Sequence, residues 1–189
     1  MQRISVAQGY PAKFEEWFPA TVNGKDTVSY ILENGWNKPR DIVRLIIAAQ
    51  NDNLHCRDTH FSQISFKSLR KEYSKNSLTE IRQELQSLYS IEEIEMIFHL
   101  LIGGDRFVTP ESIRKKAPKG SRAREFWDAN HQRILEDFYR VGFWGNVKRN
   151  EHTDWSWRWN HKSDIGVLVG NGWELAIHPA LCSELSIRL

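Results

Sequence analysis

The feature that most constrains the fold of this chain is a series of helix and strand signals between residues 90 and 160. Ser90 begins an apolar helical pattern that a Gly-Gly pair ends, because polar caps start helices and glycine often terminates them. Thr109 and Ser121 start two further helices in the same way. In chain order, the predicted elements are a helix at 90–102, a strand at 106–108, helices at 109–117 and 121–142, and strands at 143–148 and 155–160.

This order of elements predicts the architecture of the C-terminal half. Helix, strand, helix, turn, helix, strand, loop and strand is the order of a winged helix-turn-helix. Each element carries its own start or stop signal, and agreement between independent signals is better evidence for a fold than one propensity. We therefore predict a mainly α protein with a small β-wing (α+β), in which a helical segment precedes a winged helix-turn-helix.

The N-terminal half carries the signals of a helical segment. Asp26 or Thr27 caps a short helix, and Pro39 opens a longer helix with a broad apolar face. A further helix is predicted at 62–73. Ser77 then begins another helix with a capping box, since a glutamate follows three residues later.

Positive charge is concentrated in the C-terminal half. Residues 104–189 hold 14 basic and 11 acidic side chains, and no acid lies between Glu111 and Glu125. In a winged helix this stretch forms the turn before the third helix, which approaches DNA, so its cations would neutralise phosphates. The alternative is a solvated charged face. The predicted nucleic-acid-binding residues are Arg114, Lys115, Lys116, Lys119, Arg122 and Arg124, with Lys148 and Arg149, and also Arg158 and Lys162, on the wing.

Three tryptophans alternate with polar residues at Trp155, Trp157 and Trp159. In a strand this spacing places all three indoles on one face. Core packing is expected for at least two of them. The third is a candidate for a domain or subunit interface, where tryptophan is enriched, and base stacking is a weaker alternative.

The reactive residue types form no catalytic or metal-binding pattern. His55, Cys56 and His60 lie close together, but no second group shows the spacing of metal ligands. Cys182 follows an apolar run, which is typical of a packed thiol. Gly24 and the lysine after it lack the upstream glycine of a phosphate-binding loop and are interpreted as a surface turn. We therefore predict no enzyme activity, no metal and no cofactor for this chain.

Cysteine usage and hydropathy bear on the location of the protein. Two cysteines do not provide a disulfide framework. No apolar run approaches the roughly 20 residues that span a bilayer. The first residues lack the apolar stretch of a signal peptide. We expect a cytoplasmic protein that does not enter a membrane.

Two parts of the sequence resemble a known family. The segment Trp36–Leu45, with its Pro-Arg-Asp-Ile run, resembles a motif in the lid region of bacterial STAND-like and AAA+-like P-loop ATPases. Ile134–Asn146, together with Ile177–Leu181, is similar to the winged-helix end of the same proteins, and the match spans most of residues 14–182. The resemblance implies that Arg40 senses the γ-phosphate of ATP, provided that another segment or chain supplies the ATPase core.

With this resemblance, the chain divides into a lid-like helical segment at 1–52, a helical connector at 53–90 and a winged-helix domain with a C-terminal extension at 91–189. The expected function is double-stranded DNA binding or regulation, as the C-terminal module of a STAND-like ATPase in a family linked to phage defence. The expected partners are DNA and an ATPase core. The sequence does not decide whether the chain also forms a homo-oligomer. The alternative is a winged helix that mediates protein–protein interaction through its tryptophan face and does not bind DNA.

Overall fold

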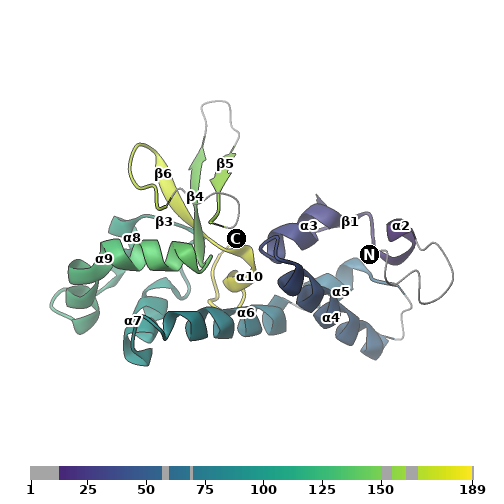
Figure 1. Cartoon of the computed structure of the whole chain (residues 1–189), viewed down its shortest axis with the longest axis horizontal. Coiled ribbons are helices and arrows are strands. Elements are labelled where there is room, and N and C mark those ends of the chain that lie inside the picture. The colour runs from purple at the N-terminus through teal and green to yellow at the C-terminus, as the bar shows by residue number, and fades with distance from the viewer. Residues whose placement is uncertain (1–12, 57–59, 69, 150–154, 161–165, 189) are drawn as a thin grey trace. The chain divides into compact units, whose positions relative to one another are not determined.

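The computed structural model of the chain describes residues 13–56, 60–68, 70–149, 155–160 and 166–188 (Figure 1). Its helices and small antiparallel sheets place it in the α+β class. Contacts between Cα atoms divide it into two units, Met1–Tyr73 and Ser74–Leu189. Each unit is described by itself below.

The first unit is helical and contains a short β-hairpin. The hairpin turns at Asn23 and Gly24, whose φ angles of 53° and 76° suit the two-residue turn of such a hairpin. Gly24 therefore lies in a surface turn, as the sequence indicates, and the lysine after it begins β2. The elements of this unit are α2 (Phe14–Trp17), β1 (Thr21–Val22), β2 (Lys25–Asp26), α3 (Thr27–Asn34), α4 (Pro39–Cys56) and α5 (Gln63–Ser68).

Aromatic side chains form much of the core of the first unit. The buried Phe66 ring lies 5.8 Å from the Tyr30 ring and 5.9 Å from the Phe61 ring. Phe18 stacks on Phe61 with the ring centroids 4.6 Å apart. Asp26 caps α3 by accepting a hydrogen bond from a first-turn N–H at 2.9 Å, which confirms one of the two predicted caps.

The second unit combines helices with a four-stranded antiparallel sheet, and the boundary with the first unit falls within α6. The strand order is β3-β6-β4-β5, so β6 pairs with both β3 and β4 although it comes last in the chain. The elements are α6 (Arg70–Leu85), α7 (Ile91–Leu101), β3 (Phe107–Val108), α8 (Pro110–Lys116), α9 (Arg122–Arg140), β4 (Trp144–Arg149), β5 (Trp155–Arg158), β6 (Trp173–Ile177) and α10 (Pro179–Cys182).

One face of this sheet packs against α9. Trp144, Leu175 and Ile177 belong to this face and are completely buried. The Trp144 ring lies 5.1 Å from the Phe138 ring of α9, and its indole N–H donates a hydrogen bond to the Leu135 carbonyl at 3.0 Å. Because side chains alternate along a strand, the neighbouring residues point to the opposite face of the sheet.

The caps predicted for three helices of this unit are present. Ser90 forms a capping box at the start of α7, and Thr109 forms another at the start of α8. The hydroxyl of Ser121 accepts a hydrogen bond from a first-turn N–H of α9 at 3.2 Å. The starts predicted for α7, α8 and α9 are therefore confirmed.

The predicted break between two helices before Ser77 is wrong. α6 runs without interruption from Arg70 to Leu85, with Ser74 and Ser77 buried inside it. The Ser74 hydroxyl accepts a hydrogen bond from the backbone N–H of Glu184 at 2.9 Å. Tertiary packing along α6 therefore overrides the local capping signal.

Candidate nucleic-acid interface

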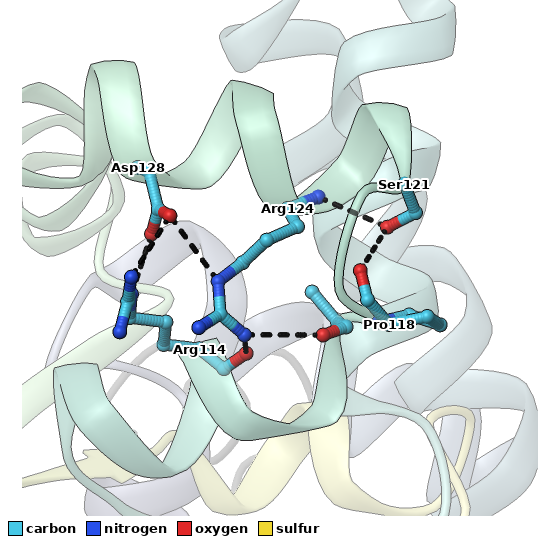
Figure 2. Close-up of polar contacts among 6 residues, drawn as sticks. Arg114, Pro118, Ser121, Arg124 and Asp128 are labelled. Atoms are coloured by element: carbon cyan, nitrogen blue, oxygen red, sulfur yellow. Dashed lines mark hydrogen bonds and ion pairs between the residues drawn. The ribbon is translucent and has the colours of Figure 1, made fainter.

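A tight turn between α8 and α9 fixes the start of α9 (Figure 2). Gly120 adopts a φ of 73°, a left-handed conformation that favours glycine. The Ser121 hydroxyl donates a hydrogen bond to the Pro118 carbonyl at 2.8 Å, and its oxygen accepts one from the Arg124 N–H at 3.2 Å. These contacts hold the N-terminal end of α9 in one orientation relative to α8.

Two arginines and an aspartate join the two helices, and we call them the clamp: Arg114, Arg124 and Asp128. Arg114 forms a bidentate pair with Asp128, with Nε–Oδ1 and Nη2–Oδ2 distances of 2.6 and 3.0 Å. Arg124 binds the same carboxylate through Nε at 3.2 Å. The hydrogen bonds from Arg114 and then from Arg124 hold the pKa of the Asp128 carboxyl below its usual value.

Arg124 also closes the C-terminal end of α8. Its Nη1 donates hydrogen bonds to the carbonyls of Arg114 at 2.7 Å and of Ala117 at 3.2 Å (Figure 2). Carbonyls in the last turn of a helix lack partners within the helix. The Arg124 side chain is only 15% exposed. Two of the six basic residues singled out in this turn, Arg114 and Arg124, therefore stabilise the fold itself.

Three of the other basic residues lie exposed around the turn, and we call them the turn cations: Lys115, Lys119 and Arg122. They lie at the end of α8, in the turn and at the first position of α9. Lys116 is also exposed, but its ammonium group packs against Gly104, where an added Cβ would collide with it. Glu125 is exposed one turn after the start of α9. The positive surface is therefore centred on the turn and does not continue along α9.

The basic residues predicted for the wing lie on β4 and β5. Arg149 is exposed and Lys148 is half-buried. Because successive strand residues point to opposite faces, these two cations project to opposite sides of the sheet. Arg158 is exposed, and its guanidinium lies 5.6 Å from the centre of the Trp173 ring. Lys162 lies outside the described residues.

The three tryptophans of the wing lie side by side, as their alternation predicts. The ring centroids of Trp155 and Trp157 are 6.1 Å apart, and those of Trp157 and Trp159 are 6.3 Å apart. Trp159 is buried against His178, whereas Trp155 and Trp157 are 41% and 37% exposed. At least two buried indoles were expected from the sequence; the structure buries one of the three.

Trp159 packs directly on the backbone of Gly145. A Cβ added at Gly145 would lie 2.6 Å from two indole carbons, which is far inside van der Waals contact. β4 is paired on both sides, so its backbone has little room to move away. We expect Gly145→Ala to lower the free energy of unfolding by about 1–3 kcal/mol, measured by urea unfolding.

A double-mutant cycle tests the cause of this loss. In a Trp159→Leu background the clash is relieved, so Gly145→Ala should cost less there than in the unchanged chain. An equal loss of unfolding free energy in the two backgrounds would contradict the proposed contact between Trp159 and Gly145.

Arg40 lies in the first turn of α4. Its Nε is 3.5 Å from Oδ1 of the buried Asp41, and Nη1 of Arg44 is 3.3 Å from the same oxygen. The Arg40 side chain is 65% exposed. A local salt bridge therefore engages this arginine at the start of the helix while its side chain stays open to solvent.

A buried carboxylate that the sequence did not single out is Asp137 of α9. It accepts a hydrogen bond from the Tyr89 hydroxyl at 2.7 Å, and Nε of Arg133 lies 3.4 Å from it. Burial, and then the hydrogen bond to Asp137, raise the pKa of the Tyr89 phenol above its usual value. This network joins α9 to the turn between α6 and α7. In the sequence, this network is indicated by the i, i+4 spacing of Arg133 and Asp137.

In the part of the chain that the structure describes, no three potential ligands come together as a metal site. In the same part, no helix is both long enough and apolar enough to cross a membrane. Cys182 is buried, and its thiol lies 3.5 Å from the His178 carbonyl. The side chains of two candidate metal ligands, His55 and Cys56, lie outside the described part.

Residues 2–82 match the model of a protein family described as a FunZ-associated C-terminal helical domain. The matched stretch takes in the first unit and most of α6. No curated protein and no solved structure matches the chain. Over its first unit, the chain is therefore similar to a helical domain that is named for a C-terminal position.

Proposed function

We propose that residues 91–189 form a winged helix-turn-helix that binds double-stranded DNA. The chain order α7, β3, α8, α9, β4, β5 and β6, with β6 between β3 and β4 in the sheet, supports this assignment. The hairpin of β4 and β5 then serves as the wing. In this fold α9 is the helix that enters the major groove with its N-terminal end first.

The observation that carries the proposal is the separation of roles among the basic residues of the turn. In the clamp both guanidinium groups are engaged by the one carboxylate of Asp128, which fixes the geometry of α8 and α9. The turn cations project from this fixed frame at the N-terminal end of a 19-residue helix. Cations there neutralise phosphates, and the helix dipole favours anions at the same end.

The acidic residues of α9 limit what kind of binding is proposed. Glu125 lies on the exposed side of the helix, close to Arg122 in sequence, and would repel a phosphate placed further along α9. Asp128 is neutralised by two arginines. Contacts from the turn and from Arg149 on the wing position a protein on DNA without reading its sequence. The proposed binding is therefore mainly non-specific.

We propose further that the chain acts as a DNA-binding or regulatory C-terminal module of a STAND-like P-loop ATPase, in defence against phage. The match of residues 2–82 to a C-terminal helical domain supports the modular part of this proposal. In this arrangement the chain would bind DNA, and a separate core would bind and hydrolyse ATP. The exposed Arg40 is the residue that would reach a nucleotide on such a core.

The dependence of DNA binding on salt tests the proposed function. With four phosphates neutralised, by the turn cations and by Arg149 on the wing, affinity for a random duplex should fall roughly 150-fold between about 50 and 200 mM salt. Fluorescence anisotropy with a labelled duplex measures both the affinity and the slope. Absence of binding at the lower salt would refute DNA binding and leave protein–protein interaction as the function of this unit.

A further inference from the structure

The face of the four-stranded sheet that points away from α9 carries a cluster of aromatic rings. Strand pairing places Phe107 opposite Ala176, and Ala176 opposite Gly145, on this face. The two central positions are small, so large rings from the outer strands can lie across them. We call the cluster the aromatic sheet surface, and it consists of Phe107, Trp155 and Trp157 with the guanidinium of Arg106.

The rings of this surface contact one another. Phe107 and Trp155 are nearly parallel, at 11°, with centroids 5.2 Å apart, and Trp157 lies 6.0 Å from Phe107. The Arg106 guanidinium lies 5.1 Å from the centre of Trp157 and 5.7 Å from that of Phe107. Residues from β5 and from the start of β3 are thus held in one arrangement before any ligand is bound.

Packing alone does not account for this surface. The rings cover the sheet residues beneath them, since Val147 and Ala176 are completely buried. Trp155 and Trp157 nevertheless remain 41% and 37% exposed, although aromatic side chains of this size are usually highly buried. The aromatic sheet surface therefore has exposed ring area that is available for ligand binding.

The charges around the rings indicate what kind of ligand this is. Arg106 lies among the rings, and Arg149 is exposed opposite Trp155 on the same face. Glu174, which pairs with Val147, is the acidic residue that the described strands place on this face. Two guanidinium groups and one carboxylate give this face a net positive charge, which favours an anionic ligand over an uncharged protein surface.

We propose that the aromatic sheet surface binds single-stranded nucleic acid. Exposed aromatic rings beside arginine are the arrangement by which proteins hold single strands, since bases stack on the rings and cations follow the backbone. This surface lies on the sheet and is separate from the turn cations. Its function does not depend on duplex binding, and a chain with both surfaces would bind at the boundary between paired and unpaired DNA.

The test compares three ligands and two variants of the full chain at about 50 mM salt. The ligands are an oligothymidylate of about 20 nucleotides, an abasic oligomer of the same length and charge, and a random duplex. Trp155→Leu/Trp157→Leu keeps an apolar cover on the sheet but removes the indole rings. The variant Lys115→Glu/Lys119→Glu/Arg122→Glu removes the turn cations, which are most of the proposed duplex contacts, and leaves the aromatic sheet surface intact.

The expected result is that the leucine variant binds oligothymidylate at least about tenfold more weakly and binds the duplex as the unchanged chain does. The glutamate variant should bind the duplex more weakly and bind oligothymidylate as the unchanged chain does. Failure of one surface is therefore distinguished from failure of the other. Thermal unfolding checks that both variants are folded. A second measurement needs no variant, because the unchanged chain should prefer oligothymidylate to the abasic oligomer and show quenched tryptophan fluorescence.

Three outcomes would overturn the proposal. Equal affinity for the abasic oligomer would mean that charge alone attracts the strand. Absence of binding to oligothymidylate would exclude single strands altogether. A dimer of the unchanged chain that the leucine variant loses, without any single-strand binding, would identify the surface as an interface between copies of the chain.

Discussion

Replacing Phe138 by alanine is expected to lower the free energy of unfolding of the second unit by about 3–5 kcal/mol. Phe138 is completely buried in the last turn of α9. The truncation leaves a cavity at the junction of helix and sheet, where the neighbouring rings cannot close in because each is fixed by other contacts. Rings of four other residues lie within 6.4 Å of it: Tyr89, Phe98, Phe143 and Trp144.

Hydrogen exchange of the α9 and β4 amides, followed by mass spectrometry, measures this loss within the second unit. Global unfolding is less direct, because two units need not unfold together. Leu88→Ala is the matched control, since Leu88 is 44% exposed and its truncation should change stability by less than about 0.5 kcal/mol. Similar effects of the two substitutions would show that Phe138 is not at the centre of the core.

The helix starts of the second unit could be predicted because their causes are local. Ser90, Thr109 and Ser121 each accept a hydrogen bond from a backbone N–H within the first turn of their own helix. Such a cap depends on residues three positions apart and hardly on the rest of the fold. The same signal failed at Ser77, where a helix continues through the serine because its side chain is buried.

The strand β6 could not be predicted because its pairing is distant in sequence. β6 inserts between β3 and β4, and its Ala176 pairs with Phe107, far earlier in the chain. Its five residues show no simple alternation of exposed and buried positions, since Leu175, Ala176 and Ile177 are all buried. A short strand that is covered on both faces lacks the pattern that marks a half-exposed one.

The candidate site was predictable in composition but not in the roles of its residues. The absence of acids between Glu111 and Glu125 correctly marks the turn between α8 and α9 as basic. Asp128 lies just beyond this stretch, and only the packing of the two helices brings Arg114 to it. The sequence therefore shows which cations are present, while the fold decides which of them are engaged by the clamp.

Charge reversal at the turn cations is expected to weaken duplex binding roughly a thousand-fold at about 50 mM salt without lowering the melting temperature. Lys115→Glu/Lys119→Glu/Arg122→Glu removes three phosphate contacts, so the slope of log affinity against log salt should also fall by about 3. These side chains are exposed and lie outside the clamp, which is why stability should be preserved. Anisotropy titrations at several salt concentrations and thermal unfolding of the same samples measure both quantities.

Arg124→Gln is the matched comparison, because Arg124 lies two residues after Arg122 in the same turn of α9. It removes the hydrogen bonds to the carbonyls of Arg114 and Ala117, which should cost about 1–3 kcal/mol of stability. Duplex affinity should change little wherever this variant remains folded, since the side chain is only 15% exposed. If Arg124→Gln instead weakened DNA binding as strongly as the triple variant while keeping its melting temperature, Arg124 would be a phosphate contact, and the division between clamp and turn cations would be wrong.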